Sequence, residues 1–281
     1  MEIFIEILKA IFIGIVQGIT EWLPVSSTGH MIIANEFVGL KVSADCWDLF
    51  EVITQLGSIL AVVILFFDKL NPWSKNKDEA MRKKTWSLWF KVVVAVLPAA
   101  VIGILLEDWL DEKFYNFIVV AIALIVYGVL FIVIERINKN KKYKVEDVYD
   151  IDYPTALKIG CFQVLSLIPG TSRSGSTILG ASTVGVSRTA AAEFSFFLAI
   201  PVMAGASALK AFKAFVLDGV SLSSTEIIVL LTGTVTAFLV SMVAIKFLMA
   251  FVKKHSFESF GWYRIGLGII LIIYYIIKIN I

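Results

Sequence analysis

Two short polar segments interrupt otherwise apolar sequence. Residues 17–30 bring a carboxylate, an imidazole, an amide and hydroxyls together in Gln17, Glu21, Ser26, Ser27, Thr28 and His30. Residues 169–177 bring a guanidinium and hydroxyls together in Thr171, Ser172, Arg173, Ser174, Ser176 and Thr177. An ionisable side chain costs roughly 2.5–3.5 kcal/mol at the centre of a bilayer, so such groups persist there mainly where they face a polar cavity. The two segments are therefore the candidate functional site.

The second segment has the composition of a phosphate-binding site. Arg173 follows the Pro169-Gly170 pair and precedes a short apolar run that we expect to form a half-helix. The free N–H groups of a helix N-terminus attract anions, and a guanidinium binds two phosphate oxygens at once. The competing interpretation is a helix contact rich in Ser and Thr, with Arg173 reaching towards lipid headgroups.

The first segment offers hard oxygen ligands and a proton-transfer group. Gln17 and Glu21 are four residues apart, so a helix places them on one face. Together with phosphate oxygens and water, they suit Mg²⁺ or Ca²⁺. His30 titrates near neutral pH and could act as a general acid, a general base or a nucleophile. A hydrogen-bonded structural histidine is the alternative.

Composition indicates an integral membrane protein. The chain has 281 residues, of which 58% are hydrophobic, and its mean hydropathy is +0.85. A net charge of +2, with the basic residues in loops between apolar stretches, excludes nucleic acid as an expected partner. Cys46 and Cys161 are far apart and lack metal-ligand spacing, so we expect both to be small buried apolar residues.

Apolar stretches predict an all-α polytopic membrane fold in a single membrane domain. Each of six stretches has about the 20 residues that a membrane-crossing helix needs, at 49–67, 89–106, 116–135, 190–216, 226–251 and 262–279. Two further regions, 4–42 and 155–186, are broken by Pro24 and by Pro169-Gly170. We expect these regions to be re-entrant helical hairpins, because irregular backbone at membrane depth must be satisfied by protein or water.

Loop charge predicts the orientation of the spans. The loops after the first and third spans are rich in Lys and Arg, and basic loops stay on the cytoplasmic side. The loop after the second span is acidic, and residues 218–226 hold no Lys or Arg, so both should face outward.

The two halves of the chain resemble each other. Four residues recur at a constant offset of 146, which pairs Gly14, Gln17, Ser26 and Gly29 with Gly160, Gln163, Ser172 and Gly175. We expect repeats at 1–140 and 150–281, each with one hairpin followed by three spans. Because three is odd, the second repeat should be inverted, and paired broken helices in inverted repeats form a binding site near the midplane.

These segments, together with residues 50–58, closely resemble the undecaprenyl-pyrophosphate phosphatase family of bacteria, also called bacitracin-resistance proteins. The resemblance covers nearly the whole chain. It implies hydrolysis of a C55 isoprenyl diphosphate to the monophosphate at the outer face of the plasma membrane, which recycles the lipid carrier of peptidoglycan synthesis. It also implies a fold with two re-entrant hairpins inside an inverted repeat.

The resemblance further implies roles for individual residues. Glu21 would bind the metal or activate water, His30 would transfer protons, and Ser27 or Ser26 would be a nucleophile or a phosphate ligand. Arg173 would clamp the diphosphate, and the expected substrate-binding residues are Ser26, Thr28, Ser172, Arg173, Ser174, Thr177 and Glu51. Gln17 stands where many members have Glu, which puts in doubt any mechanism that needs two carboxylates on the metal.

Two other carboxylates have expected structural roles. Glu51 lies one turn before Gln55 and could orient His30 or Arg173. Glu193 could be a structural hydrogen-bonding residue or pair with Arg188.

A different function class remains open. Inverted repeats with broken helices are also the architecture of secondary transporters, so the same site could carry polyprenyl phosphate or a related lipid across the membrane. The set of Glu21, Ser27 and His30 favours hydrolysis, because a carrier has no evident use for a proton-transfer group beside a nucleophile. Gly and Ala faces on the spans suit internal packing as well as a homodimer.

Overall fold

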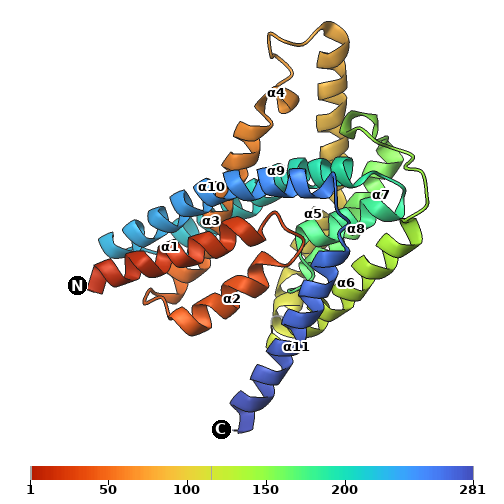
Figure 1. Ribbon diagram of the computed structural model, residues 1–281. Helices are drawn as coiled ribbons and strands as arrows, with labels where there is room; N and C mark the ends of the chain where they lie inside the picture. The colour runs from red at the N-terminus through yellow and green to blue at the C-terminus, as the bar shows by residue number, and fades with distance from the viewer. Residues whose placement is uncertain (1, 115, 281) are drawn as a thin grey trace. The chain divides into compact units, whose positions relative to one another are not determined.

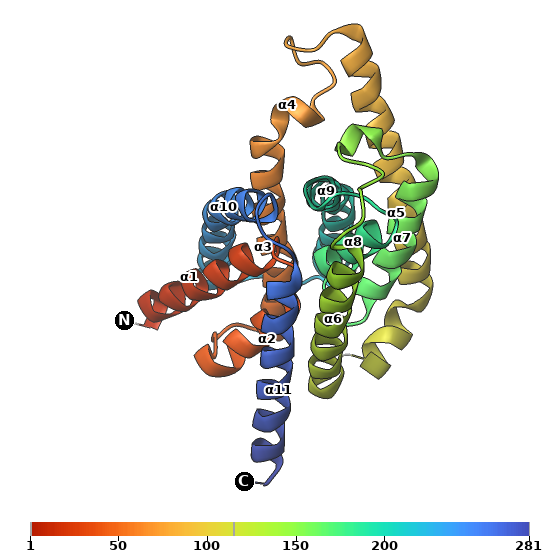
Figure 2. The same ribbon diagram turned by 45° about the vertical axis from the view of Figure 1, so that its right-hand side comes forward.

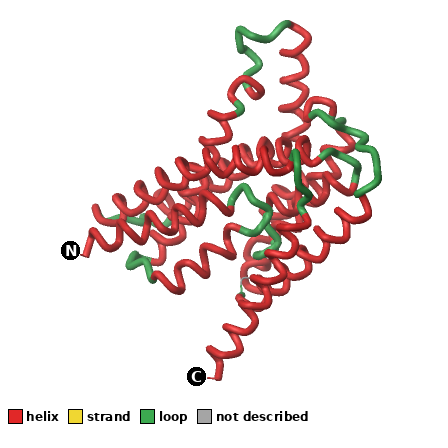
Figure 3. The backbone as a smooth tube through the Cα atoms, in the orientation of Figure 1, coloured by secondary structure: helices red, strands yellow, loops and turns green. Residues whose placement is uncertain are grey.

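The computed structural model describes residues 2–114 and 116–280, and helices form nearly all of it (Figures 1 and 3). Its α-helices are α1 (Glu2–Thr20), α2 (Ser27–Val38), α3 (Ala44–Leu65), α4 (Phe67–Leu70), α5 (Glu79–Phe114), α6 (Phe117–Asn138), α7 (Tyr153–Val164), α8 (Arg173–Thr183), α9 (Arg188–Phe212), α10 (Ser224–Val252) and α11 (Glu258–Asn280). Short 3₁₀ turns at Val148–Asp150 (η1) and Leu165–Leu167 (η2) and a π turn at Lys213–Leu217 (η3) complete the set. Within these ranges no strand is present, which confirms the all-α prediction.

Seven helices of the described residues are long and apolar enough to cross a membrane, and six of them overlap the six predicted spans, with ends that differ by a few residues or more. The helices extend beyond the apolar stretches: α5 begins ten residues before the predicted span, because its first turns are charged but still helical. The seventh is α1, whose window Ile3–Thr20 has a mean hydropathy of 1.9. The sequence predicted this segment as one arm of a re-entrant hairpin, so by length and composition α1 exceeds the expected half-helix.

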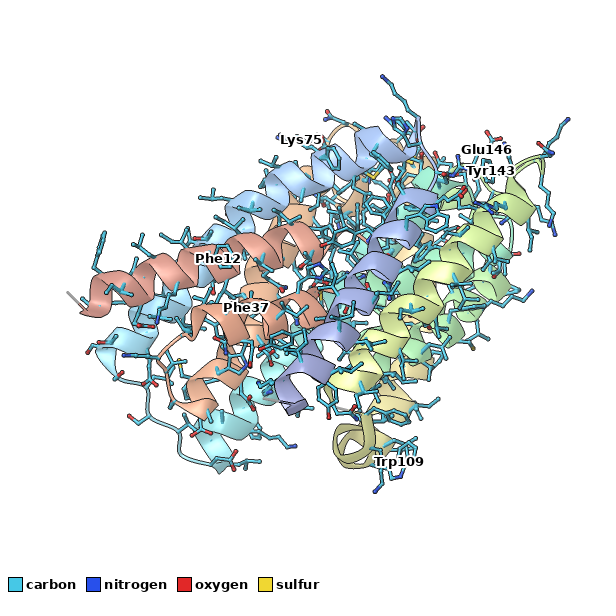
Figure 4. All side chains as sticks on the ribbon, turned by 60° about the horizontal axis from the view of Figure 1, so that its bottom comes forward. Phe12, Phe37, Lys75, Trp109, Tyr143 and Glu146 are labelled. Atoms are coloured by element: carbon cyan, nitrogen blue, oxygen red, sulfur yellow. The ribbon has the colours of Figure 1, made fainter. Side chains whose placement is uncertain are left out.

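Large apolar side chains cover the outer faces of these helices. Ile104 and Leu105 on α5 are 73% and 74% exposed, and Phe12 and Phe37 project from α1 and α2 in Figure 4. Such surfaces would be unfavourable in water but are stable against lipid. They fit the multi-pass membrane protein that composition indicates.

The chain divides into two compact units that interleave in sequence. The first unit consists of the described parts of Met1–Trp22, Ser27–Phe67 and Ala199–Phe247. The second unit consists of the described parts of Leu23–Ser26, Asp68–Leu198 and Leu248–Ile281. The loop Leu23–Ser26 thus belongs to the second unit, although the residues on both sides of it belong to the first.

In the first unit, glycines let α10 approach α1 and α3 closely. A Cβ built on Gly14 would lie 2.7 Å from the carbonyl oxygen of Gly233, and one built on Gly57 would overlap the carbonyl oxygen of Thr234. Small residues at such contacts allow backbones to pack directly, which is a main source of helix association in membranes. The helices α1 and α2 form a hairpin within this unit (Figure 1).

In the second unit, α6 and α11 pack antiparallel, with contacts from Phe117 and Tyr275 at one end to Phe131 and Phe257 at the other. Gly128 and Gly261 face each other, because a Cβ on either would lie 2.7 Å from the carbonyl oxygen of the other. Helix α7 lies beside α5 (Figure 2), and Gly160 packs directly on the backbone of Ala95. Helix α8 packs against α6 and α7.

Within the second unit, a polar network connects Lys69 of α4 and the loop before α5 to α9. Lys69 Nζ donates to both carboxylate oxygens of Glu193 at 2.7 Å, and Lys77 Nζ donates to the Lys69 carbonyl at 2.9 Å. Lys77 Nζ also donates to Thr85 Oγ1 of α5 at 2.8 Å, and burial lowers the pKa of Lys77. Glu193 is therefore structural, as expected, but its partner is Lys69. The predicted partner, Arg188, instead pairs with Glu135 at 2.6 Å.

The two cysteines differ in environment. Cys46 is fully buried in α3, as predicted, whereas Cys161 is exposed on α7. The prediction that both are buried is thus wrong for Cys161. A helical apolar segment does not reveal from its sequence which of its faces packs against protein.

We predict that Gly57→Ala destabilises the protein, because its Cβ would press on the backbone of Thr234, which cannot move aside as a side chain tip could. Overpacking of this kind costs about 1–3 kcal/mol. Gly205→Ala is the matched control, since nothing lies within 4 Å of a Cβ at that helical position in the same unit. Thermal unfolding in detergent should give a lower Tm for Gly57→Ala alone, and equal Tm values would contradict the packing account.

Candidate functional site

Most of the predicted site residues lie in two breaks in the helices or in the helical turns next to these breaks. The first break, residues 21–26, lies between α1 and α2, and the second break, residues 168–172, lies between η2 and α8. Ser26 has φ +76° and Ser172 has φ +73°, and among the described residues these are the two non-glycine positions with positive φ. Each serine directly precedes a helix. Backbone strain of this kind persists only where surrounding structure holds it, and it often marks functional segments.

The two strained serines are equivalent in the sequence repeat. Ser26 and Ser172 are separated by the same offset of 146 that relates Gly14 and Gly160. The breaks therefore share an unusual backbone conformation as well as residue types. This likeness supports an internal repeat, while the inverted arrangement of its copies remains a prediction.

Ser172 prepares the start of α8 for an anion. Its Oγ accepts a hydrogen bond from the Gly175 N–H at 3.1 Å and lies 3.2 Å from Ser174 Oγ. The side chain thus caps a helix whose N-terminal end carries partial positive charge. Ser174 is buried and donates its hydroxyl to the carbonyl of Leu23 in the first break at 3.3 Å.

Arg173 is held by a residue that sequence analysis did not identify. Its Nη1 donates to the carbonyl of Ser195 at 2.7 Å, and Thr177 Oγ1 lies 2.7 Å from Ser195 Oγ. Ser195 is fully buried in α9 and belongs to the second unit with Arg173 and Thr177. The guanidinium is therefore fixed in orientation on one side, which favours directed binding of phosphate oxygens.

In the first unit, Glu21 is the centre of a small hydrogen-bonded group. Its Oε2 accepts from Gln17 Nε2 at 3.0 Å and from Ser27 Oγ at 2.8 Å. The predicted shared face of Gln17 and Glu21 is thus present. Ser27 donates its proton directly to a buried carboxylate, which is the arrangement of a hydroxyl nucleophile beside its base.

His30 lies in the first turn of α2, three residues after Ser27. This spacing places the two side chains on the same side of the helix. His30 and Thr28 are both half-buried. The His30 imidazole therefore lies one helical turn from Ser27, which donates a hydrogen bond to Glu21.

Glu51 is in α3 of the first unit, and its Oε1 is buried without a hydrogen-bond partner. It therefore makes no hydrogen bond to His30 from that oxygen. Its expected role in orienting other site residues stays a prediction.

The residues of the first break fit a cation that arrives with phosphate. Among the described residues, no three His, Cys, Asp or Glu side chains gather closely enough to hold a metal ion by themselves. Glu21 supplies one carboxylate, while Gln17 turns its amide N–H towards that carboxylate. Mg²⁺ is commonly bound by one or two carboxylates together with substrate phosphates and water. The donor set therefore suits a cation that brings further oxygen ligands with it better than a permanent metal centre.

Arg264 is the other residue that sequence analysis missed. It lies in α11, is fully buried, and donates to the carbonyls of Pro24, Gly170 and Thr171 at 3.0, 2.8 and 2.9 Å. Within the second unit, one side chain thus contacts the Leu23–Ser26 part of the first break and the second break. A single arginine near the start of an apolar span was the only available sign of it in the sequence.

Comparison with known proteins gives one consistent result. The family model described as bacitracin resistance protein BacA matches residues 10–270. An undecaprenyl-diphosphatase of Enterococcus faecalis is 57% identical over 274 residues, which cover 98% of this chain and 99% of the relative. Undecaprenyl-diphosphatases of Acetivibrio thermocellus and Streptococcus thermophilus are 55% and 53% identical, and they cover 97% and 99% of this chain and 98% and 96% of their own lengths.

We predict different costs for two substitutions of Ser172. Ser172→Gly removes the cap but introduces a residue that adopts positive φ without strain, so it should lose little stability. Ser172→Ala removes the cap and keeps the strain, so it should cost about 0.5–2 kcal/mol. Thermal unfolding in detergent should rank wild type and Ser172→Gly above Ser172→Ala; an unchanged Tm for Ser172→Ala would show that the cap contributes nothing.

Proposed function

The chain belongs to the bacitracin resistance protein BacA family, and from this premise we propose that it is an integral-membrane undecaprenyl-diphosphatase. It hydrolyses undecaprenyl diphosphate to undecaprenyl phosphate and inorganic phosphate. This reaction returns the lipid carrier to peptidoglycan synthesis and confers bacitracin resistance. The observation that carries the proposal from geometry is the 2.8 Å hydrogen bond from Ser27 Oγ to Glu21.

That hydrogen bond supports a chemical step at Glu21 and Ser27. Ser27 Oγ attacks the terminal phosphorus, its proton passes to Glu21 Oε2, and the anhydride bond to the lipid phosphate breaks. His30 donates a proton to the departing lipid phosphate. Water then attacks the phosphoserine and gives a proton to His30, while Glu21 returns its proton to Ser27 Oγ as the phosphorus–oxygen bond breaks, which releases inorganic phosphate and restores both side chains.

The second break binds the diphosphate. Arg173, oriented by Ser195, pairs with phosphate oxygens, and the capped N-terminus of α8 attracts the same anion. Ser172, Ser174 and Thr177 are the hydroxyls around it, and Ser26 and Thr28 serve the corresponding role at the start of α2. The pyrophosphate group is thus bound by the Arg173 guanidinium and the N-terminus of α8, neither of which takes part in bond making or breaking.

A divalent cation, Mg²⁺ or Ca²⁺, is part of this proposal. Glu21 would hold it, with Gln17 orienting the carboxylate. When bound, the cation neutralises charge on the diphosphate. One carboxylate is sufficient here because the substrate supplies further oxygen ligands.

Transport of the lipid is the less favoured function. A carrier would use Arg173 and the hydroxyls for binding, but it does not need a serine that donates its proton to a buried carboxylate. The Ser27–Glu21 pair therefore separates the two functions, and it supports hydrolysis.

The cellular setting follows from loop charge and from family membership. We place the protein in the bacterial plasma membrane, with its site opening to the outer face, because the basic loops after α3 and α6 favour the cytoplasmic side. Polyprenyl diphosphate reaches such a site from the lipid phase. A homodimer remains a prediction: Gly14, Gly57 and Gly128 all make contacts inside a unit, so these small residues do not require a second copy.

We predict that the purified protein releases phosphate from farnesyl diphosphate in detergent when Mg²⁺ or Ca²⁺ is present, and that a chelator stops this release. His30→Ala should lose at least 100-fold in kcat, because general acid–base catalysis contributes about 10²–10⁴-fold. His255→Ala is the matched control, since this second histidine lies in the loop after α10 and stacks on Phe251. Absence of release by folded wild-type protein would exclude the hydrolase and favour the carrier.

A further inference from the structure

Arg264 carries a charge that has no ion pair. Its side chain is 0% exposed, and the ion pairs of the described residues do not include it. Removing a charge from water is expensive, and buried arginines are normally compensated by carboxylates. In this protein, three backbone carbonyls take that place.

The three carbonyls come from both breaks. Nη1 donates to Pro24 in the first break, and Nη2 donates to Gly170 and Thr171 in the second break. Carbonyls that leave a helix at membrane depth have no water to accept from, so they need a donor from the protein. The planar guanidinium can serve both breaks at once because its donors point in fixed, divergent directions.

The guanidinium is itself held in place from two sides. Its central carbon lies 5.4 Å from the centre of the Tyr127 ring, a cation–π contact that partly offsets desolvation. On the α8 side, a Cβ on Gly175 would lie 3.1 Å from Nη1, so the glycine leaves room for it. Tyr127 in turn accepts a hydrogen bond from Ser176 of α8 at 3.3 Å.

We propose that Arg264 is a positioning residue for the diphosphatase reaction: it fixes the first break against the second break through their backbone carbonyls. Pro24 lies between Glu21 and Ser27 in the chain, and Thr171 lies two residues before Arg173. Arg264 therefore acts through the backbone that connects Glu21 to Ser27 and through the backbone that precedes Arg173. This inference rests on the proposed function.

The test compares Arg264→Lys with wild type in the phosphate-release assay. Lysine keeps the positive charge but lacks the planar guanidinium with its separate donors, so it cannot donate hydrogen bonds to carbonyls of both breaks. We expect kcat to fall at least tenfold, KM to change less than threefold, and the protein to remain folded by gel filtration in detergent. Arg136→Gln is the control, because Arg136 is an exposed arginine of the same unit that pairs with Glu258 on the surface.

Two variants of Tyr127 test the proposal if Arg264→Lys does not fold. Tyr127→Leu removes the ring that supports the guanidinium, whereas Tyr127→Phe keeps the ring and removes the hydroxyl. We expect the loss of kcat in Tyr127→Leu to be at least threefold larger than in Tyr127→Phe, with KM little changed.

The outcomes separate this proposal from the proposed function. A wild-type protein that releases no phosphate refutes the hydrolase itself. An active wild type with an equally active Arg264→Lys variant, or equal kcat values for the two Tyr127 variants, overturns the positioning role alone. A loss that appears entirely in KM would also overturn it, because it would make Arg264 a binding residue.

Discussion

Backbone carbonyls that leave a helix inside an apolar protein must find donors, and this constraint organises the structure. Each of the two breaks ends one helix and begins another within apolar sequence, so each exposes carbonyls that lipid cannot satisfy. Arg264 satisfies Pro24, Gly170 and Thr171 together. This explains why a buried arginine has no carboxylate beside it: its hydrogen-bond partners are the backbone carbonyls of the breaks.

Hydrogen bonds from Arg264 to the backbone of the breaks help to maintain the strained conformation of the last serine in each break. Ser26 and Ser172 have a conformation that a serine rarely adopts, and each begins a helix whose first turn carries reactive groups. At α2 that turn contains Ser27, which donates to Glu21, and at α8 it contains Arg173, which is oriented by Ser195. The proposed nucleophile Ser27 and the proposed anion-binding residue Arg173 therefore occupy positions that correspond at the offset of 146, and the proposed phosphoryl transfer uses both.

The sequence predicts the parts of this arrangement that depend on local composition. Apolar length identifies the six spans, Pro and Gly identify the breaks, and helical spacing places Gln17 beside Glu21. The contacts that depend on distant segments were not predictable: Ser195 is one serine among apolar residues, and the carbonyls that Arg264 serves carry no side-chain signature. The same reason explains why the partner of Glu193 and the exposure of Cys161 differ from expectation. The sequence did not predict the full length of α1, because hydropathy does not distinguish a half-helix from a helix that is long enough to span a membrane.

The most direct test of the account is a double-mutant cycle that combines Ser27→Ala with Arg173→Lys and measures kcat/KM for farnesyl diphosphate. Groups that act on one transition state are not additive, so removing the second costs little after the first is lost. The account predicts that the double variant is about as impaired as the more impaired single variant. Fold-losses that multiply would contradict it, because they would show that the two breaks act independently.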